Sequence, residues 1–261
     1  MMAYWFYGFV FLLGLCLGSF YNVCILRYLK KESILWPPSH CPSCGHKLKW
    51  WENIPLLSFI LLRGKCSHCQ KKISLLYPLV ELISGIIALG LWWQYGWSLA
   101  FFLYLILFGL LIVASFIDLL SFLLPDILTL PGAFLALLFS FWLPQPGVKS
   151  AFLGAGAGFL LFLVIQKGYK WAKGIDGLGG GDVKLMLMLG ALTGIKGLLP
   201  MIFVSALLAL MGSVFFWLKG KVSKGESAIP YGPFLSLATV LYVFTGDKWW
   251  DIYRWLMGLS Y

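Results

Sequence analysis

Four of the six cysteines form two C-x2-C pairs, Cys41 with Cys44 and Cys66 with Cys69. At this spacing two knuckles of chain hold a tetrahedral metal ion through four thiolates, and Zn²⁺ is the ion expected. Four protein ligands leave no open position for substrate, so the predicted metal has a structural role. Free thiols are the alternative, and a disulfide framework is disfavoured in a reducing compartment.

The remaining cysteines and the histidines have simpler interpretations. Cys16 and Cys24 lie in the first apolar run and are interpreted as small packing residues. His40, His46 and His68 are near the cysteine pairs but are not needed to complete a tetrahedron. We therefore expect these histidines to be solvated loop residues.

Carboxylates in apolar runs are the second chemical signal, because an ionisable side chain inside a membrane costs about 3 kcal/mol unless it is paired or functional. Glu81 lies near the start of one run, where either a helix N-terminus or a functional role accounts for it. Asp118 ends another run. Asp126 opens the next one and is interpreted as a helix N-cap.

Asp182 closes the glycine-rich segment GLGGGD at residues 177–182. A phosphate-binding loop is a weak interpretation, because the Walker lysine pattern and a preceding strand are missing. Glycines let a backbone pass close to another chain and adopt angles closed to other residues, which suits a site that admits an extended peptide. A linker turn in which Asp182 caps the next helix is the alternative.

Two carboxylates at one membrane face have a defined chemistry. They share a proton and titrate as a coupled pair, because both do not ionise easily at close range. One then deprotonates a water molecule while the other protonates the scissile carbonyl oxygen, as in aspartic proteases. Asp118 and Asp182 are the predicted pair, provided that the apolar segments place them at the same face.

The elements that must position these residues are apolar. The chain has 261 residues, of which 61% are hydrophobic and 11% charged, and its mean hydropathy is +0.88. Apolar runs of about 20 residues, the length that crosses ~30 Å of hydrocarbon, recur along it. We predict an all-α polytopic membrane protein with about eight transmembrane helices and a small zinc-ribbon-like cytoplasmic domain after the first helix.

Three segments are predicted: a retained first transmembrane helix at 1–26, a cytoplasmic zinc-binding loop domain at 27–76, and a transmembrane helical bundle with the aspartic protease site at 77–261. The bundle ends in an aromatic, interfacial tail that contains Trp249, Trp250 and Trp255. The crossings are expected near residues 4–25, 77–95, 98–116, 127–143, 150–166, 183–193, 198–218 and 229–244.

Basic residues predict the orientation. The net charge of +10 suggests a nucleic-acid partner at first sight, but Lys and Arg in a membrane protein concentrate in cytoplasmic loops, so no nucleic acid is expected. Eight crossings place residues 27–76, 167–173 and 219–224 on the cytoplasmic side together with Asp118 and Asp182. If segment 183–193 were not a crossing, the 219–224 loop would lie outside, against this rule.

These residues resemble those of the bacterial type IV prepilin peptidases, bifunctional leader peptidase and N-methyltransferase proteins of the Gly-x-Gly-Asp intramembrane aspartic proteases. The resemblance covers nearly the whole chain, and Gly180 stands at the variable position of the glycine motif. It rests on GSFYNV at 18–23 with Arg27, the two cysteine pairs, ENIP at 52–55, YPLVE at 77–81, Asp118 with LPD at 124–126, and GGGDVK at 179–184.

The resemblance implies that Asp118 and Asp182 are the catalytic aspartates. Substrates would be type IV prepilins or pseudopilins, cut after a short basic leader that ends in Gly, and the new N-terminal amine would be methylated from S-adenosylmethionine. Gly64 falls at a position associated with methylation, and Glu81 is carried over as a second methyl-donor residue. The implied location is the bacterial inner membrane, with the active site and the zinc loop facing the cytoplasm.

Two other classes of protein fit part of the sequence. A proton-coupled membrane transporter with a cytoplasmic zinc-ribbon domain also accounts for sparse intramembrane acids, but it predicts carboxylates near the bilayer midplane and inverted repeats. A membrane metalloprotease requires an open metal site such as His-Glu-x-x-His, which the sequence lacks.

Overall fold

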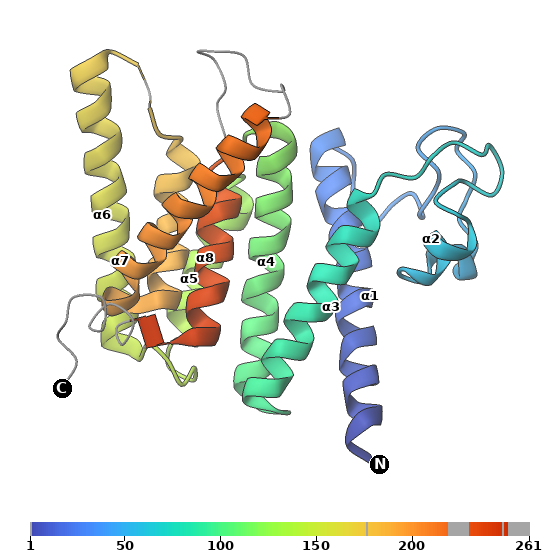
Figure 1. Cartoon of the computed structure of the whole chain (residues 1–261), viewed down its shortest axis with the longest axis horizontal. Helices are drawn as coiled ribbons and strands as arrows, with labels where there is room; N and C mark the ends of the chain where they lie inside the picture. Colours follow the sequence, from blue (N-terminus) through green and yellow to red (C-terminus); the bar gives the residue numbers. More distant parts are fainter. Residues whose placement is uncertain (1, 176, 219–229, 247, 250–261) are drawn as a thin grey trace. The chain divides into compact units, whose positions relative to one another are not determined.

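The computed structural model describes residues 2–175, 177–218, 230–246 and 248–249 (Figure 1). In these residues the regular secondary structure is helical, with two isolated β-bridges. The predicted 219–224 loop, the predicted start of the last crossing at Ile229, and Trp250 and Trp255 of the predicted tail lie outside the described residues. The chain divides into two compact units, Met1–Val113 and Ala114–Tyr261.

The first unit is built on two helices that pack closely, α1 (Met2–Lys30) and α3 (Leu76–Tyr95). A Cβ placed on Gly14 would lie 2.7 Å from atoms of α3, and one on Gly18 would lie 2.6 Å from the Cα of Glu81. Small residues four apart let helices approach in a membrane, where burial from water does not drive their association. The glycine of the GSFYNV motif, Gly18, is therefore a packing residue.

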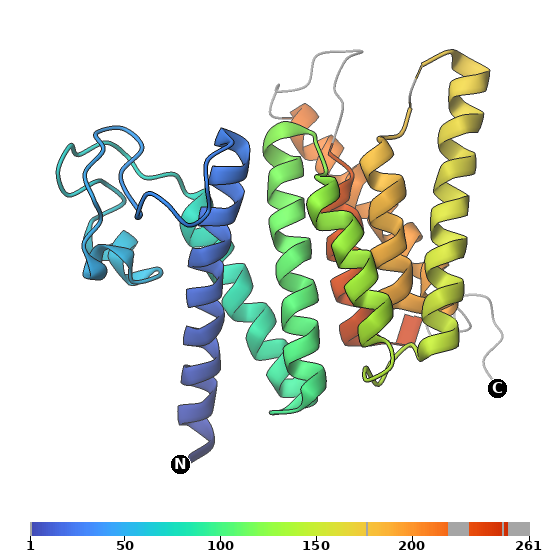
Figure 2. The same ribbon diagram turned by 180° about the vertical axis from the view of Figure 1, so that it is seen from behind.

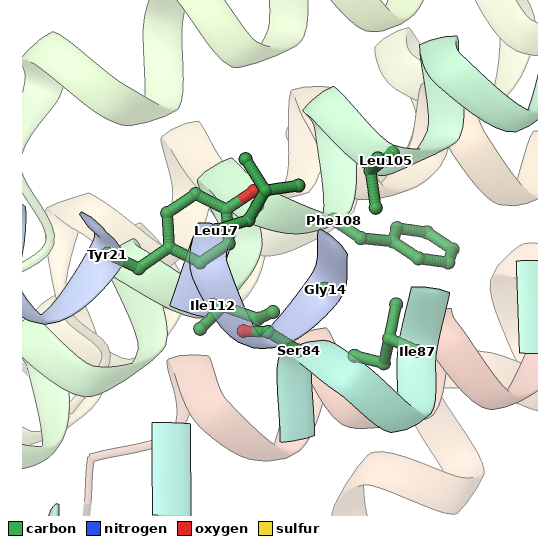
Figure 3. A pocket seen from close by; sticks show the side chains of 9 residues that line it. Gly14, Leu17, Tyr21, Ser84, Ile87, Leu105, Phe108 and Ile112 are labelled. Carbon is green, nitrogen blue, oxygen red and sulfur yellow. The ribbon is translucent and has the colours of Figure 1, made fainter. Parts of the chain in front are cut away.

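A third helix, α4 (Leu99–Ser121), begins in the first unit and continues into the second. Its first part lies beside α1, because a Cβ on Gly109 would collide with the ring of Tyr21. Figure 3 shows the crevice that remains, which is mainly apolar and too narrow to admit a water molecule. This crevice is a packing seam between helices and not a ligand site.

The chain segment that connects α1 to α3 forms a small module, which contains a 3-10 helix, η1 (Trp50–Asn53), and a short helix, α2 (Leu57–Leu61). Arg27, in the last turns of α1, is 7% exposed and attaches the start of this module. Its guanidinium donates hydrogen bonds to three backbone carbonyl groups, which compensate for the burial of its charge. They belong to Ser33 (2.7 Å), Ile34 (2.9 Å) and Pro37.

The second unit contains the end of α4 and four further helices, three of which pack against α7 (Figure 2). Glycines let α6 and α7 approach, because a Cβ on Gly154 would collide with the carbonyl oxygen of Gly190. The four helices are α5 (Asp126–Phe139), α6 (Val148–Lys173), α7 (Gly180–Leu218) and α8 (Gly232–Thr245).

The long helix α7 is interrupted at Gly194, whose φ of 67° and ψ of 178° are not helical. Glycine adopts such angles without the steric penalty of a side chain. Figures 1 and 2 show the chain reversing direction at this point, so that both ends of α7 lie at the same end of the unit. The break falls between the predicted segments 183–193 and 198–218, and the shorter one is a separate helical arm.

Within the described residues, five helices are long and apolar enough to cross a membrane: α1, α3, α4, α6 and α7. The helices α5 and α8 have only 14 residues each. Large apolar side chains such as Leu160, Val164 and Phe203 are exposed on the helices, as expected where lipid is the solvent. An all-helical membrane protein is confirmed, whereas the count of about eight crossings and the boundaries at residues 26 and 76 stay predictions.

Candidate active site and metal centre

Asp118 lies in the last turn of α4 and is 5% exposed. Its Oδ2 accepts a hydrogen bond of 3.1 Å from the backbone N–H of Gly232, the first residue of α8. The first N–H groups of a helix have no acceptor within that helix, so they are available to a side chain. The contact joins the C-terminal end of α4 to the N-terminal end of α8.

Asp182 lies in the first turn of α7 and is 8% exposed. The Gly179 backbone hydrogen-bonds its carboxyl group, and Asp118 is close enough for the two aspartates to interact electrostatically. Its Oδ1 finds no hydrogen-bond partner among the described residues. A buried polar atom without a partner is rare, and it marks Asp182 as a functional candidate.

The three glycines before Asp182 are not equivalent. A Cβ on Gly179 would lie 3.1 Å from Oδ2 of Asp182, and one on Gly181 would lie 2.6 Å from the Cβ of Leu124. The nearest atom to a Cβ on Gly180 would be 3.8 Å away, which is an ordinary contact. Gly181 therefore lets α7 start against the turn between α4 and α5, and Gly179 leaves room for the Asp182 carboxyl group. Gly180 has space for a side chain.

Asp126 and Lys184 form an ion pair at the same end of the second unit. The Lys184 Nζ lies 2.8 Å from Oδ1 and 2.7 Å from Oδ2 of Asp126. The helix α5 begins at Asp126, its N-cap residue is Pro125, and no side-chain cap bond is formed. The interpretation of Asp126 as an N-cap is therefore wrong, because its carboxylate lies inside the first turn and binds Lys184.

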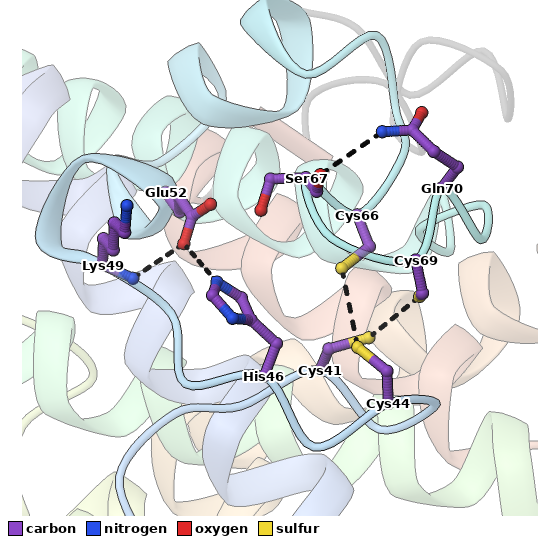
Figure 4. A network of polar contacts seen from close by, with 9 residues as sticks. All are labelled: Cys41, Cys44, His46, Lys49, Glu52, Cys66, Ser67, Cys69 and Gln70. Atoms are coloured by element: carbon purple, nitrogen blue, oxygen red, sulfur yellow. Dashed lines mark hydrogen bonds and ion pairs between the residues drawn. The ribbon is translucent and has the colours of Figure 1, made fainter.

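The four paired cysteines are brought together in the module of the first unit (Figure 4). Their sulfur atoms all lie within 4.8 Å of one another, with 3.9 Å from Cys41 to Cys69 and 4.0 Å from Cys44 to Cys66. A tetrahedral ion with sulfur ligands at ~2.3 Å places those ligands roughly 3.8 Å apart. The donor set and its spacing therefore fit a metal ion.

The two knuckles that carry these cysteines share one backbone pattern. In each, the N–H of the first cysteine, Cys41 or Cys66, donates at 2.9 Å to the carbonyl five residues later. The residue after the second cysteine has a positive φ in both, 71° at Gly45 and 57° at Gln70. Glycine adopts this conformation freely, whereas Gln70 does so at a steric cost.

The knuckle backbone favours thiolates, which are the metal-binding form of cysteine. Although desolvation opposes it, backbone N–H groups lower the pKa of the Cys41 thiol to about 6. Backbone N–H groups also lower the pKa of Cys66. Despite a similar backbone bond, desolvation and the neighbouring sulfurs raise the pKa of Cys44 to about 12. A bound cation would offset this crowding of thiols, since a metal deprotonates the thiols that coordinate it.

His46 is not a solvated loop residue, contrary to expectation. Its Nε2 lies 3.4 Å from Oε2 of Glu52 (Figure 4). Its ring stacks on His68 with centroids 5.3 Å apart. The Ser67 hydroxyl, the Lys49 N–H at 2.8 Å and His46 hold the pKa of the buried Glu52 carboxyl below its usual range. The glutamate of the ENIP motif therefore joins η1 to both knuckles.

A cavity of about 420 Å³ lies between this module and helices α1 and α3. Small-molecule sites occupy roughly 300–1,000 Å³. Asn22 and Glu81 line the cavity, and both are buried. The Oε2 of Glu81 accepts a hydrogen bond of 2.9 Å from the Leu56 N–H, whereas Oδ1 of Asn22 has no partner within the described part of the chain. Cys41 and Cys66 line the cavity too, so the metal centre forms part of its wall.

Gly64 supports the cavity wall from behind. Its φ is 65°, and a Cβ placed on it would lie 3.0 Å from the ring of Phe59, which lines the cavity. A larger residue at this position would therefore push Phe59 and strain the backbone. The link between position 64 and the cavity is steric and indirect.

Sequence reasoning missed Gly232 and its neighbour Tyr231. Gly232-Pro233 before an apolar run is a signal for the start of a helix. Nothing in that signal points to Asp118, which is 114 positions earlier. Asn22 was noticed only as part of a motif, and its unpartnered oxygen is visible only in the folded chain.

The fold and the site define a polytopic membrane protein with two buried carboxylates at one end of its second unit and a four-cysteine module in its first. The Type IV leader peptidase family model matches residues 105–214, and the Bacterial Peptidase A24 N-terminal domain matches residues 12–95. The chain belongs to this family, as its motifs predicted.

Curated relatives match most of this chain. A prepilin leader peptidase/N-methyltransferase of Xanthomonas campestris pv. campestris is 39% identical and covers 95% of this chain and 94% of its own length. One from Neisseria gonorrhoeae is 37% identical over 93% of this chain and 92% of its own length. One from Myxococcus xanthus is 40% identical over 82% of this chain and 64% of its own length. No solved structure matches the chain significantly.

Proposed function

We propose that this chain is a membrane-embedded aspartic endopeptidase that removes the leader of type IV prepilin-like proteins and then N-methylates the new N-terminal residue. The peptidase rests on one observation: the buried carboxylates of Asp118 and Asp182 lie within electrostatic range of each other at one end of a helical unit. Both activities are in the names of the relatives. Nothing in the structure or the relatives favours the transporter alternative.

Asp118 and Asp182 share one proton in this mechanism. The charged carboxylate takes a proton from water, whose oxygen attacks the scissile carbonyl carbon, while the protonated partner donates its proton to the carbonyl oxygen. When the tetrahedral intermediate collapses, the pair takes a proton back from one of its two hydroxyl groups, the C–N bond breaks, and the amine leaves with a proton from the pair. The two carboxylates then again hold one proton between them.

The peptidase site and the cysteine module face the cytoplasm of a bacterial inner membrane in this proposal, and the chain crosses the membrane eight times. The reversal at Gly194 supports the eighth crossing, because it makes two arms of α7. The last turns of α6 and the first turn of α7, next to Asp182, carry Lys167, Lys170, Lys173 and Lys184. This concentration of lysine is typical of a cytoplasmic face.

The 420 Å³ cavity is the proposed site for S-adenosylmethionine. When bound, this molecule supplies an electrophilic methyl group on a positively charged sulfonium. The carboxylate of Glu81 is suited to face that positive charge, and Oδ1 of Asn22 accepts a hydrogen bond from an amine. Zn²⁺ held by the four cysteines stabilises the wall that Cys41 and Cys66 contribute.

The proposal is tested by incubating the purified protein with a prepilin-like peptide, with and without S-adenosylmethionine, and weighing the products. Asp118→Asn and Asp182→Asn should abolish cleavage but still methylate a synthetic peptide that begins at the cleaved residue. Glu81→Gln should cleave normally and lose methylation. Near-normal cleavage by either asparagine variant would remove the aspartic mechanism.

A further inference from the structure

The start of α8 is the third element that reaches the two aspartates. Tyr231 and Gly232 follow the 105–214 range that matches the leader peptidase family model. Gly232 nevertheless donates a backbone hydrogen bond to the carboxyl group of Asp118, at 3.1 Å in a buried environment. This bond fixes one oxygen and so limits the rotation of the Asp118 carboxyl group. Because an N–H group only donates, Oδ2 of Asp118 acts as an acceptor here, and the shared proton is left to the remaining oxygens of the two aspartates.

Space, and not backbone conformation, requires glycine at position 232. Its φ lies outside the left-handed region, so the backbone is open to any L-residue. A Cβ at this position would lie 2.7 Å from Oδ2 of Asp118 and 3.1 Å from a methyl group of Leu124. The leucine methyl is the flexible end of its side chain, so the carboxyl group of Asp118 is the atom group that must move.

Tyr231 anchors this turn to the rest of the second unit. Its hydroxyl lies 2.7 Å from the hydroxyl of Ser205, which is fully buried in the second arm of α7. Its ring stacks on Phe162 of α6, with centroids 6.4 Å apart and an interplanar angle of 8°. Tyr231 also interacts electrostatically with Asp182. Of these two adjacent residues, Gly232 therefore contacts Asp118, and Tyr231 lies within electrostatic range of Asp182.

We propose that Gly232 is a positioning residue of the peptidase, which holds the Asp118 carboxyl against Asp182 through its N–H and its missing side chain, and that the Tyr231–Ser205 hydrogen bond holds Gly232 in place. The inference rests on the proposed function of the two aspartates. It makes the start of α8 part of the peptidase site, although Gly232 itself carries no titratable group.

The direct test is Gly232→Ala, compared with Gly156→Ala, where a Cβ on α6 would meet nothing within 4 Å. Because a small displacement of a catalytic group is costly, Gly232→Ala should lower kcat for a prepilin-like peptide by roughly a hundredfold and leave KM within about twofold. Its pH–rate profile should shift, since the geometry of the coupled pair changes. The Gly156→Ala protein should match wild type.

The same samples provide a control for folding. Gly232→Ala should still methylate a peptide that begins at the cleaved residue, because that reaction uses the cavity of the first unit. Wild-type kcat and an unchanged pH profile in Gly232→Ala would overturn the inference. Activity in Asp118→Asn would instead sink the proposed function, so the two failures are distinguishable.

Two less disruptive variants test the positioning role of Gly232 if Gly232→Ala does not fold. Tyr231→Phe and Ser205→Ala each remove one partner of the same hydrogen bond. Each should lower kcat by roughly threefold to tenfold, and the double variant should lose no more than either alone, because coupled changes are not additive. Wild-type kcat in both single variants would overturn the inference.

Discussion

Lys184 Nζ contacts both carboxylate oxygens of Asp126, at 2.8 and 2.7 Å, and so joins the first turn of α7 to the first turn of α5. The side chains are 40% and 56% exposed, so the pair contributes at most about 1 kcal/mol to stability in a solvated setting. Its significance lies in its position, since Lys184 is two residues from Asp182. The ion pair limits the rotation of the turn that carries the aspartate.

This pair should affect cleavage more than stability. Asp126→Asn and Lys184→Gln should each lower kcat by roughly fivefold, because a small misplacement of Asp182 is costly. Combining Asp126→Lys with Lys184→Asp should restore part of the loss, as the opposite charges meet again. Cleavage assays of the three proteins check this, and a swap that is worse than both single changes would contradict a positioning role.

The glycine motif should tolerate a side chain at one position only. Gly181→Ala should lower cleavage by at least about tenfold, because its Cβ would lie 2.6 Å from the Cβ of Leu124 and would displace Asp182. Gly180→Ala should keep most activity, because its Cβ would have 3.8 Å of space. Equal loss in both variants, measured as kcat, would show that backbone freedom and not space makes these residues glycine.

Methylation should separate from cleavage at position 64. Gly64→Val should abolish methyl transfer to a pre-cleaved peptide, since the new side chain would push Phe59 toward the cavity and strain a backbone with φ of 65°. Cleavage should stay within about twofold of wild type, because Gly64 is in the first unit. Phe59→Ala in the Gly64→Val background should recover some methyl transfer. Joint loss of both activities in a folded protein would argue against separate sites.

Metal binding by the four cysteines should weaken as the pH falls. Protons compete with the ion for thiolates, and the pKa of Cys41 is lowered to about 6 and that of Cys66 is lowered as well. Groups with lowered pKa values favour the metal-bound fold above those values and stop doing so as the pH falls through them. Zinc should therefore be retained at pH 7 and released as the pH falls below about 6, as a zinc-sensitive dye would report. Cys41→Ser should release it at pH 7.

One knuckle should be open to stabilisation. Gln70 has a φ of 57° at the position where the other knuckle has Gly45. Gln70→Gly should raise the free energy of unfolding of the module by roughly 1 kcal/mol, by removing the steric cost of the left-handed conformation. Chelator titration against metal release measures it, with Lys71→Gly as a control at a residue without a positive φ. Metal release at a lower chelator concentration in Gln70→Gly than in wild type would contradict the argument.

The positions of the helices followed from the sequence, because the length of an apolar run reflects the thickness of the hydrocarbon. The predicted segments 77–95 and 150–166 lie in α3 and α6. The ends were less accurate, since α1 continues to Lys30 and α6 to Lys173. Helical hydrogen bonding does not stop where the apolar composition stops, so hydropathy underestimates the length of these two helices.

The sequence by itself determined the four-cysteine cluster, since the spacing within each knuckle brings its two thiols together locally, and it selected Asp118 and Asp182 as the candidate pair. Only the tertiary structure decided the contacts that surround them. Gly232 meets Asp118 across 114 positions, and Lys184 meets Asp126 across 58. A backbone N–H is common to almost every residue and an interfacial lysine is ordinary, so neither carries a local pattern, and each acquires its role only from helix packing.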